Sequence, residues 1–317
     1  IIRGCCNSAP STAARMSLIT PRPAMFRPMV APMRVFSTEN DKRGGHDGEK
    51  IDFGFQQVDW EQKQGKVGEV FSSVADSYDV MNDAMSLGVH RLWKNTFVEA
   101  IGPLKRRKVL NSDYEVVDEV PLKVLDVAGG TGDISFKILD KARRDDTAAG
   151  KPSVDIIVSD INPDMLEVGK KRAVERGIFH DLNFKVINAE DLSDIESDSL
   201  DLYTISFGIR NVPDRLKALR EAHRCLRRGG RFMCLEFSEV IVPGLKQFYD
   251  FYSFNVIPEL GRAIADDKDS YQYLVESIKM FPKQAEFAMM IEDAGFKCVS
   301  YTNMTGGIVA LHTGYKL

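Results

Sequence analysis

The chain has 317 residues, of which 44% are hydrophobic and 28% are charged, and its net charge at pH 7 is −4. These proportions are typical of a globular protein and exclude a low-complexity, fully disordered chain. No run of 18 apolar residues occurs, so the sequence predicts no transmembrane helix. The five cysteines show no C-x-x-C spacing and the five histidines are scattered, so we expect no metal site.

The first 38 residues differ in composition from the rest of the chain. They contain five arginines, four serines and five prolines, but no lysine and no carboxylate. This composition is typical of a mitochondrial transit peptide, with a disordered basic tail as the alternative. We therefore expect a transit peptide over residues 1–37 and a disordered polar linker over 38–65. Without these five arginines the net charge is −9, which disfavours sequence-independent binding of nucleic acid.

A helical region follows the linker. From Val67 to Tyr78, apolar residues recur three and four positions apart, which predicts an amphipathic helix starting near Lys66. A second helix is expected from His90 to Gly102. The charged residues 105–121 are expected to form an irregular loop before the first strand.

From Leu122 onward, apolar strand-like runs alternate with helical patterns. This alternation predicts a mostly parallel sheet with helices on both faces. A helical, aromatic insertion is expected at about 243–283, and a C-terminal antiparallel hairpin is expected to close the sheet edge. The expected strands are Leu122–Val127, Asp155–Asp160, Asn183–Asn188, Leu200–Ser206, Arg231–Glu236, Lys297–Tyr301 and Gly307–Tyr315.

Small and polar residues follow the first four of these strands. Glycines at 129, 130 and 132 separate a strand from a helix, which allows backbone N–H groups to approach a ligand. Asp160 ends the second strand, where an acid can bind ribose hydroxyls. The spacing fails to match the dinucleotide pattern G-x-G-x-x-G. It instead resembles the D-x-G-x-G-x-G motif of class I S-adenosylmethionine (SAM) methyltransferases, with Ala128 at the first glycine.

Several longer motifs narrow this resemblance. They are Asp126–Asp133, Ser206–Val212, Thr305–Tyr315, Tyr78–Gly88 and Asp266–Tyr273. Together they resemble the ubiquinone/menaquinone biosynthesis C-methyltransferases over residues 66–317. The resemblance implies a Rossmann-like class I methyltransferase fold with a seven-stranded sheet, and SAM as cofactor without a metal. It also implies C-methylation of a polyprenylated methoxy-benzoquinol in ubiquinone biosynthesis.

The resemblance and the transit-like segment carry further expectations. They imply a homodimer within a multi-subunit coenzyme Q synthesis complex, on the matrix side of the mitochondrial inner membrane. Because the substrate is so apolar, we expect peripheral membrane contact through the insertion or the N-terminal helices. The aromatic side chains of the insertion either line a channel for the polyprenyl tail or form a helical core.

The family resemblance and the residues at the strand ends together imply a set of site residues. The expected cofactor-binding residues are Asp126, Gly130, Thr131, Gly132, Asp160, Asn188, Ala189 and Ser206. The expected substrate-binding residues are Tyr78, Asn82, His90, Asp267 and Tyr271. Arg210 and Asn211 are the candidate catalytic residues.

The role of Arg210 has a physical basis. The acceptor carbon becomes nucleophilic when a ring hydroxyl ionises, which costs a phenol of pKa near 10 about 4 kcal/mol at pH 7. The Arg210 guanidinium would offset part of this cost by holding the phenolate, and Asn211 would orient the oxygen or a water. The proton would leave through water or through His90, Tyr78 or Asp267.

Other functions remain open at this point. Another small-molecule O- or N-methyltransferase is the main alternative. A nicotinamide-dependent dehydrogenase is a weaker one. A non-catalytic scaffold in a quinone-synthesis complex belongs to a different functional class.

Overall fold

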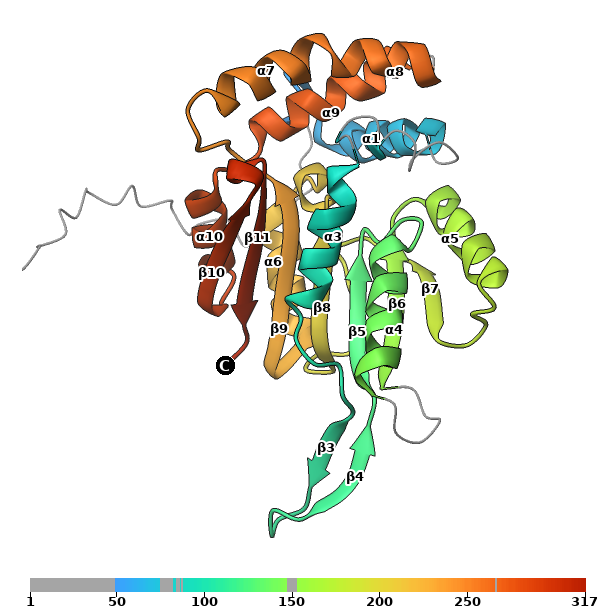
Figure 1. Ribbon diagram of the computed structural model, residues 1–317. Helices are drawn as coiled ribbons and strands as arrows, with labels where there is room; N and C mark the ends of the chain where they lie inside the picture. The colour runs from blue at the N-terminus through green and yellow to red at the C-terminus, as the bar shows by residue number, and fades with distance from the viewer. Residues whose placement is uncertain (1–48, 75–81, 84–85, 87, 147–152, 266) are drawn as a thin grey trace, which may run out of the picture. The chain divides into compact units, whose positions relative to one another are not determined.

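A computed structural model describes residues 49–74, 82–83, 86, 88–146, 153–265 and 267–317, all of which belong to one compact unit. A seven-stranded sheet forms its centre, with the strand order β10-β11-β9-β8-β5-β6-β7 (Figure 1). The strands β5 to β9 pair in parallel, whereas β11 and β10 are antiparallel. The predicted sheet is therefore confirmed. Its strands are β5 (Leu122–Val127), β6 (Val154–Asp160), β7 (Leu182–Val186), β8 (Leu200–Ser206), β9 (Leu226–Phe237), β10 (Lys297–Met304) and β11 (Val309–Tyr315).

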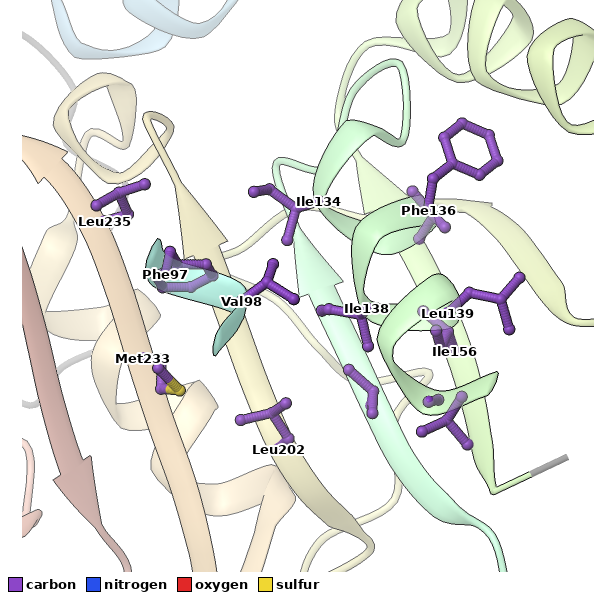
Figure 2. Close-up of a cluster of buried hydrophobic side chains, with 14 of the residues drawn as sticks. Phe97, Val98, Ile134, Phe136, Ile138, Leu139, Ile156, Leu202, Met233 and Leu235 are labelled. Carbon is purple, nitrogen blue, oxygen red and sulfur yellow. The ribbon is translucent and has the colours of Figure 1, made fainter. Parts of the chain in front are cut away.

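Helices cover both faces of this sheet. The first face carries α3 (Val89–Glu99), α4 (Asp133–Asp145) and α5 (Pro163–Glu175), and the second carries α6 (Arg215–Cys225) and α10 (Gln284–Asp293). Figure 2 shows the core of the first face, where side chains of α3 and α4 lie over sheet residues such as Leu202 and Met233. Strands of the middle of the sheet are buried on both sides, which explains their nearly continuous apolar sequence.

Local signals fix where these helices begin. The Asn162 side chain accepts hydrogen bonds from the backbone N–H groups of Asp164 and Met165, and Pro163 occupies the first turn of α5. Helix α4 begins after Gly132, whose φ of 83° is in the left-handed region. Both helices therefore start at the carboxyl edge of the sheet, next to the expected ligand site.

A second helical layer lies at that edge. It contains α7 (Leu245–Asn255), α8 (Ile257–Ala265) and α9 (Lys268–Met280), with α1 (Trp60–Val74) beside them (Figure 1). A Cβ at Gly261 of α8 would lie 2.3 Å from the Tyr271 ring of α9, so the close approach of these two helices requires glycine. Helices α7 to α9 occupy the segment in which the sequence predicts a helical insertion.

Two short hairpins differ from the sequence-based expectations. Strands β1 (Lys50–Phe53) and β2 (Gln56–Asp59) lie within the predicted linker, and α1 also begins there. The hairpin is held by contacts that are distant in sequence. The Phe53 ring stacks on that of Tyr273 at 4.1 Å, and the Phe55 N–H donates to Glu276 at 2.9 Å. Composition alone could not reveal these partners.

The second hairpin replaces the loop expected over 105–121. It contains β3 (Arg107–Leu110) and β4 (Val116–Val120), and it extends from the end of the sheet opposite α7–α9 (Figure 1). The Asn111 side chain accepts from the N–H groups of Asp113 and Glu115, both at 2.9 Å, and so stabilises the turn. Within the described part of the chain, no helix is long and apolar enough to cross a membrane.

Candidate functional site

The first part of the site is a cavity at the carboxyl ends of β5, β6 and β8, which we call the edge cavity. It has an empty volume of about 1080 Å³. Seven of the eight predicted cofactor residues line it: Asp126, Gly130, Thr131, Asp160, Asn188, Ala189 and Ser206. The eighth, Gly132, is the residue that precedes α4. The structure therefore brings the predicted set together at one edge of the sheet.

Asp126, in β5 just before the glycine loop, is fixed by two hydroxyl groups. This carboxylate is buried and accepts hydrogen bonds from Ser135 Oγ at 2.6 Å and Thr204 Oγ1 at 2.7 Å. Burial raises the pKa of Asp126 to about 6, against the opposing effect of the two hydroxyls. These two hydrogen bonds connect the end of β5 to the first turn of α4 and to β8, on either side of the glycine loop.

The departure from the glycine motif at Ala128 also has a structural reason. Ala128 has a φ of 50°, so the position does take the left-handed conformation that glycine favours. A Cβ added at Gly208 would lie 2.3 Å from the Cβ of Ala128. Gly208, in the motif after β8, is thus the glycine that permits the Ala128 side chain.

Asp160 is the most distinctive group of the edge cavity. Its Oδ2 accepts the N–H of Gly130 and its Oδ1 accepts the N–H of Asn162, both at 2.9 Å. Burial raises its pKa to about 6, while these backbone donors oppose the shift. Each carboxylate oxygen retains a further acceptor site. An acid with free acceptor capacity beside a glycine loop that lines the cavity fits the ribose diol of a nucleoside.

Helix α1 covers the edge cavity, a role that the sequence did not suggest. Its residues Gln64, Val67, Gly68 and Phe71 line the cavity. Ser72 Oγ donates to Asp164 Oδ2 at 2.8 Å, and this bond ties α1 to the start of α5. The periodicity of α1 predicts an amphipathic helix but cannot show which ligand or surface its apolar side covers.

A second cavity lies among α3, α7 and α9, and we call it the helical cavity. Its empty volume is about 1290 Å³. Most of its wall is apolar or aromatic, including Trp93, Phe237, Tyr249, Tyr252 and Tyr273. It shares Phe71, Lys94 and Phe207 with the edge cavity, so the two cavities meet at these three residues. A polar ligand in one cavity and an apolar ligand in the other would therefore face each other.

Arg210 lines the helical cavity and is fixed by a buried carboxylate. It lies in the 3-10 turn Ile209–Asn211 after β8, and its Nη1 is 3.0 Å from Glu236 Oε1. Glu236, at the end of β9, is only 1% exposed. Burial raises its pKa, and the guanidinium opposes that shift. Glu236 was missed by the sequence analysis because nothing in the sequence pairs the ends of β8 and β9.

The other predicted residues fall at different places. Asn211 lines the edge cavity, and its Oδ1 accepts a hydrogen bond from Tyr273 Oη at 3.0 Å. Asn82 and His90 line the helical cavity. His90 Nε2 lies 2.8 Å from Asp83 Oδ1, and burial lowers the pKa of the imidazole despite this contact.

Two further predicted substrate residues, Asp267 and Tyr271, line neither cavity in the structure. Asp267 caps α9 by accepting from the Ser270 N–H at 2.9 Å. Tyr271 is fully buried against α8, and its neighbour Tyr273 lines the helical cavity instead. Tyr78 lies outside the described residues. The described residues contain no group of three or more His, Cys, Asp or Glu side chains arranged to hold a metal ion.

Comparison with known proteins gives a consistent family. The sequence matches the ubiE/COQ5 methyltransferase family over residues 59–316. It is 50% identical over 277 residues to the ubiquinone/menaquinone biosynthesis C-methyltransferase UbiE of Brucella abortus, covering 87% of this chain and 95% of that protein. The UbiE of Rickettsia peacockii is also 50% identical, over 266 residues, 84% of this chain and 98% of that protein.

The comparison with solved structures concerns the fold alone. A Nostoc punctiforme protein, provisionally described as an O-methyltransferase, has a TM-score of 0.50 and 15% identity. The match covers 78% of this chain and 60% of that one. It agrees with the class I methyltransferase architecture expected from the sequence.

One sequence-based prediction is wrong. The relatives at 50% identity are bacterial proteins, from Brucella and Rickettsia, and they contradict the predicted location at the mitochondrial inner membrane. The prediction depended on the composition of residues 1–38, which precede the family match at 59–316 and lie outside the described residues. An arginine-rich, acid-free segment was therefore insufficient evidence for that location.

Proposed function

The chain belongs to the ubiE/COQ5 methyltransferase family and is a SAM-dependent methyltransferase, and we propose that its acceptor is a ring carbon of a polyprenylated methoxy-benzoquinol. The relatives are named for C-methylation in ubiquinone and menaquinone biosynthesis. The proposed substrate is of the 2-methoxy-6-polyprenyl-1,4-benzoquinol type. The observation that carries this proposal is an apolar, aromatic cavity that contains a buried guanidinium and meets the edge cavity at three shared residues.

The edge cavity fits SAM. Asp160 would bind the ribose hydroxyls, the small Ala189 side chain and Asn188 would frame the adenine, and the glycine loop would allow close backbone approach. Bound there, SAM supplies an electrophilic methyl group on a sulfonium.

The helical cavity fits an electron-rich ring with an apolar tail. Its wall is mostly apolar, so a bound ring would displace water and electrostatic contacts inside would become stronger. Arg210, held by Glu236, would stabilise the ring oxygen as it ionises. Because arginine stays protonated, it acts as a fixed cation and does not remove the proton.

His90 is the proposed route for that proton. Burial lowers its pKa, so the imidazole is neutral at pH 7 and can accept a proton. Asp83 lies 2.8 Å from Nε2 and would stabilise the resulting imidazolium. Of the three side chains considered for this step, His90 is the one whose described position is on the cavity wall.

The apolar tail of the proposed substrate would reside in a membrane, so the protein needs a surface that contacts the membrane. Phe248 of α7 lines the helical cavity and is also 65% exposed, and Phe251 nearby is 62% exposed. We propose that this apolar mouth contacts a membrane surface from which the substrate is taken. We also propose self-association and membership of a quinone-synthesis complex, which the family resemblance implies.

Product analysis with isotopically labelled SAM tests the function. The acceptors are a short-chain methoxy-benzoquinol and, for comparison, a catechol. We expect label on the ring carbon of the benzoquinol. Label on a catechol oxygen alone would identify an O-methyltransferase. SAM binding without transfer to either acceptor would favour a scaffold, and binding of NADH in place of SAM would favour a dehydrogenase.

A further inference from the structure

Lys94 occupies a position that the proposed mechanism does not yet use. It lies on α3, is 6% exposed, and lines both cavities. The other two residues shared by the cavities, Phe71 and Phe207, are aromatic and uncharged. Among the described residues, Lys94 is therefore the charged group at the junction where the two ligands would meet.

The ammonium group is held by one carboxylate. Lys94 Nζ lies 2.8 Å from Asp133 Oδ2, at the start of α4. Although burial favours the neutral acid, the Lys94 charge holds the pKa of Asp133 below its usual value, so the pair is ionic. The Lys94 side chain is 8% exposed, against 37% for that of Asp133. An ammonium has three N–H donors, and this contact uses one of them.

A buried ammonium with donors to spare needs acceptors. Burial removes most of the water that would otherwise satisfy these donors. Asp133 lines only the edge cavity. Among the described residues, Lys94 therefore has no carboxylate partner on the side that faces the helical cavity. An anionic oxygen in the cavity could accept a charge-assisted hydrogen bond from one of the remaining N–H groups.

We propose that Lys94 binds an oxyanion at the junction of the two cavities. The oxyanion is either the carboxylate at the amino-acid end of SAM or the ionised ring oxygen of the acceptor. Both would bring a negatively charged oxygen to the ammonium beside Asp133. The second source rests on the proposed function, whereas the first requires only that the protein binds SAM.

A binding experiment separates these sources. S-adenosylhomocysteine carries the carboxylate, whereas methylthioadenosine has the same nucleoside without it. Calorimetry would measure the affinity of both ligands for the wild type and for Lys94→Met, and steady-state kinetics would follow methylation of the short-chain benzoquinol. Lys141→Met is the matched control, because Lys141 is also a buried lysine paired with carboxylates but lines neither cavity.

The two sources predict different results. If Lys94 binds the SAM carboxylate, Lys94→Met weakens S-adenosylhomocysteine about tenfold to a hundredfold and leaves methylthioadenosine unchanged. If it binds the ring oxygen, both affinities stay unchanged and kcat falls by a similar factor. Lys94→Arg keeps the charge, so it restores part of either loss and also serves if the methionine variant fails to fold.

Two results would overturn the inference. One is a Lys94→Met protein with wild-type affinities and kcat. The other is an equal loss for both nucleosides, which would indicate general damage to the cavity. A wild-type protein that binds S-adenosylhomocysteine but never methylates the benzoquinol would refute the proposed function instead. In that case the nucleoside comparison still decides the inference, and unchanged affinities overturn it.

Discussion

The edge cavity and the helical cavity are built in different ways. The edge cavity is formed mainly by loops that follow β5, β6, β7 and β8, with α1 as its cover, and its polar contacts are backbone groups and short side chains. The helical cavity is formed by side chains from α3, α7, α9 and the end of β9, which lie far apart in the sequence. Parallel strands place their carboxyl ends together by construction, whereas the packing of separate helices depends on long-range contacts.

This difference suggests a division of tasks between the two cavities, one for the common ligand and one for the acceptor. A cavity made from the sheet edge serves a ligand common to many proteins of the fold. A cavity made largely from inserted helices can change without altering the sheet, so we expect it to be the part that determines the acceptor. Changes in one cavity should therefore alter one ligand and spare the other, and the predictions below test this independence.

The largest effect is expected for Arg210→Ala. Removal of the guanidinium withdraws a preorganised positive charge from the ring oxygen, so kcat should fall about a hundredfold to a thousandfold. Affinity for S-adenosylhomocysteine should stay within about twofold of wild type, since Arg210 does not line the edge cavity. Labelled-SAM kinetics and calorimetry would measure the two. Because the substitution leaves Glu236 buried without its partner, Arg210→Ala in a Glu236→Gln background serves as the folding control.

An intermediate effect is expected for Asp160→Asn. Loss of a charged acceptor should weaken S-adenosylhomocysteine about tenfold to a hundredfold. The pKa of Asp160 in the free protein is raised to about 6 by burial, so the carboxyl becomes protonated as the pH falls through 6. Wild-type affinity should therefore decline below that pH, whereas the variant should respond little. Calorimetry from pH 5 to 8 checks both, and an equal pH response in the two proteins would contradict the assigned role.

The smallest effect is expected for Tyr273→Phe. The Tyr273 hydroxyl connects the helical cavity to Asn211 of the edge cavity. The substitution removes the 3.0 Å hydrogen bond to Asn211 Oδ1 and keeps the ring that stacks on Phe53. A net loss of about 1 kcal/mol would lower kcat roughly fivefold. Tyr271→Phe is the matched control. Its buried hydroxyl has no hydrogen-bond partner among the described residues, so its loss should leave kcat unchanged. Equal effects of the two variants would show that the Asn211 contact is unimportant.

The sequence predicted the sheet and most of the edge cavity because local patterns determine both. Asp160 and the glycines are recognisable from their position after apolar strands, without knowledge of any distant contact. It predicted the helical cavity less well. Tyr271 and Tyr273 belong to the same helix and both are buried, and local sequence does not show that Tyr271 packs against Gly261 of α8 whereas Tyr273 lines the cavity. Glu236 was missed because its pairing with Arg210 joins two strand ends.

The same reasoning explains why the sequence analysis expected a disordered linker where the structure has the β1–β2 hairpin. Lys50–Asp59 follows a polar, glycine-rich stretch with a typical linker composition, although it contains Ile51, Phe53, Phe55 and Val58 itself. Its hairpin exists through Phe53 on Tyr273 and through the bond from the Phe55 N–H to Glu276. Such stabilisation by tertiary contacts leaves little trace in local sequence.

The turn of the β3–β4 hairpin is a suitable site for attaching a label or a support. Both of its strands lie largely in solvent, and Tyr114 at the turn is 85% exposed. The chain leaves and re-enters the body at neighbouring points, on the end of the sheet opposite α7–α9 (Figure 1). A fluorophore or a solid support attached at this turn would leave both ligand entrances free, so an immobilised enzyme could be assayed against lipid vesicles.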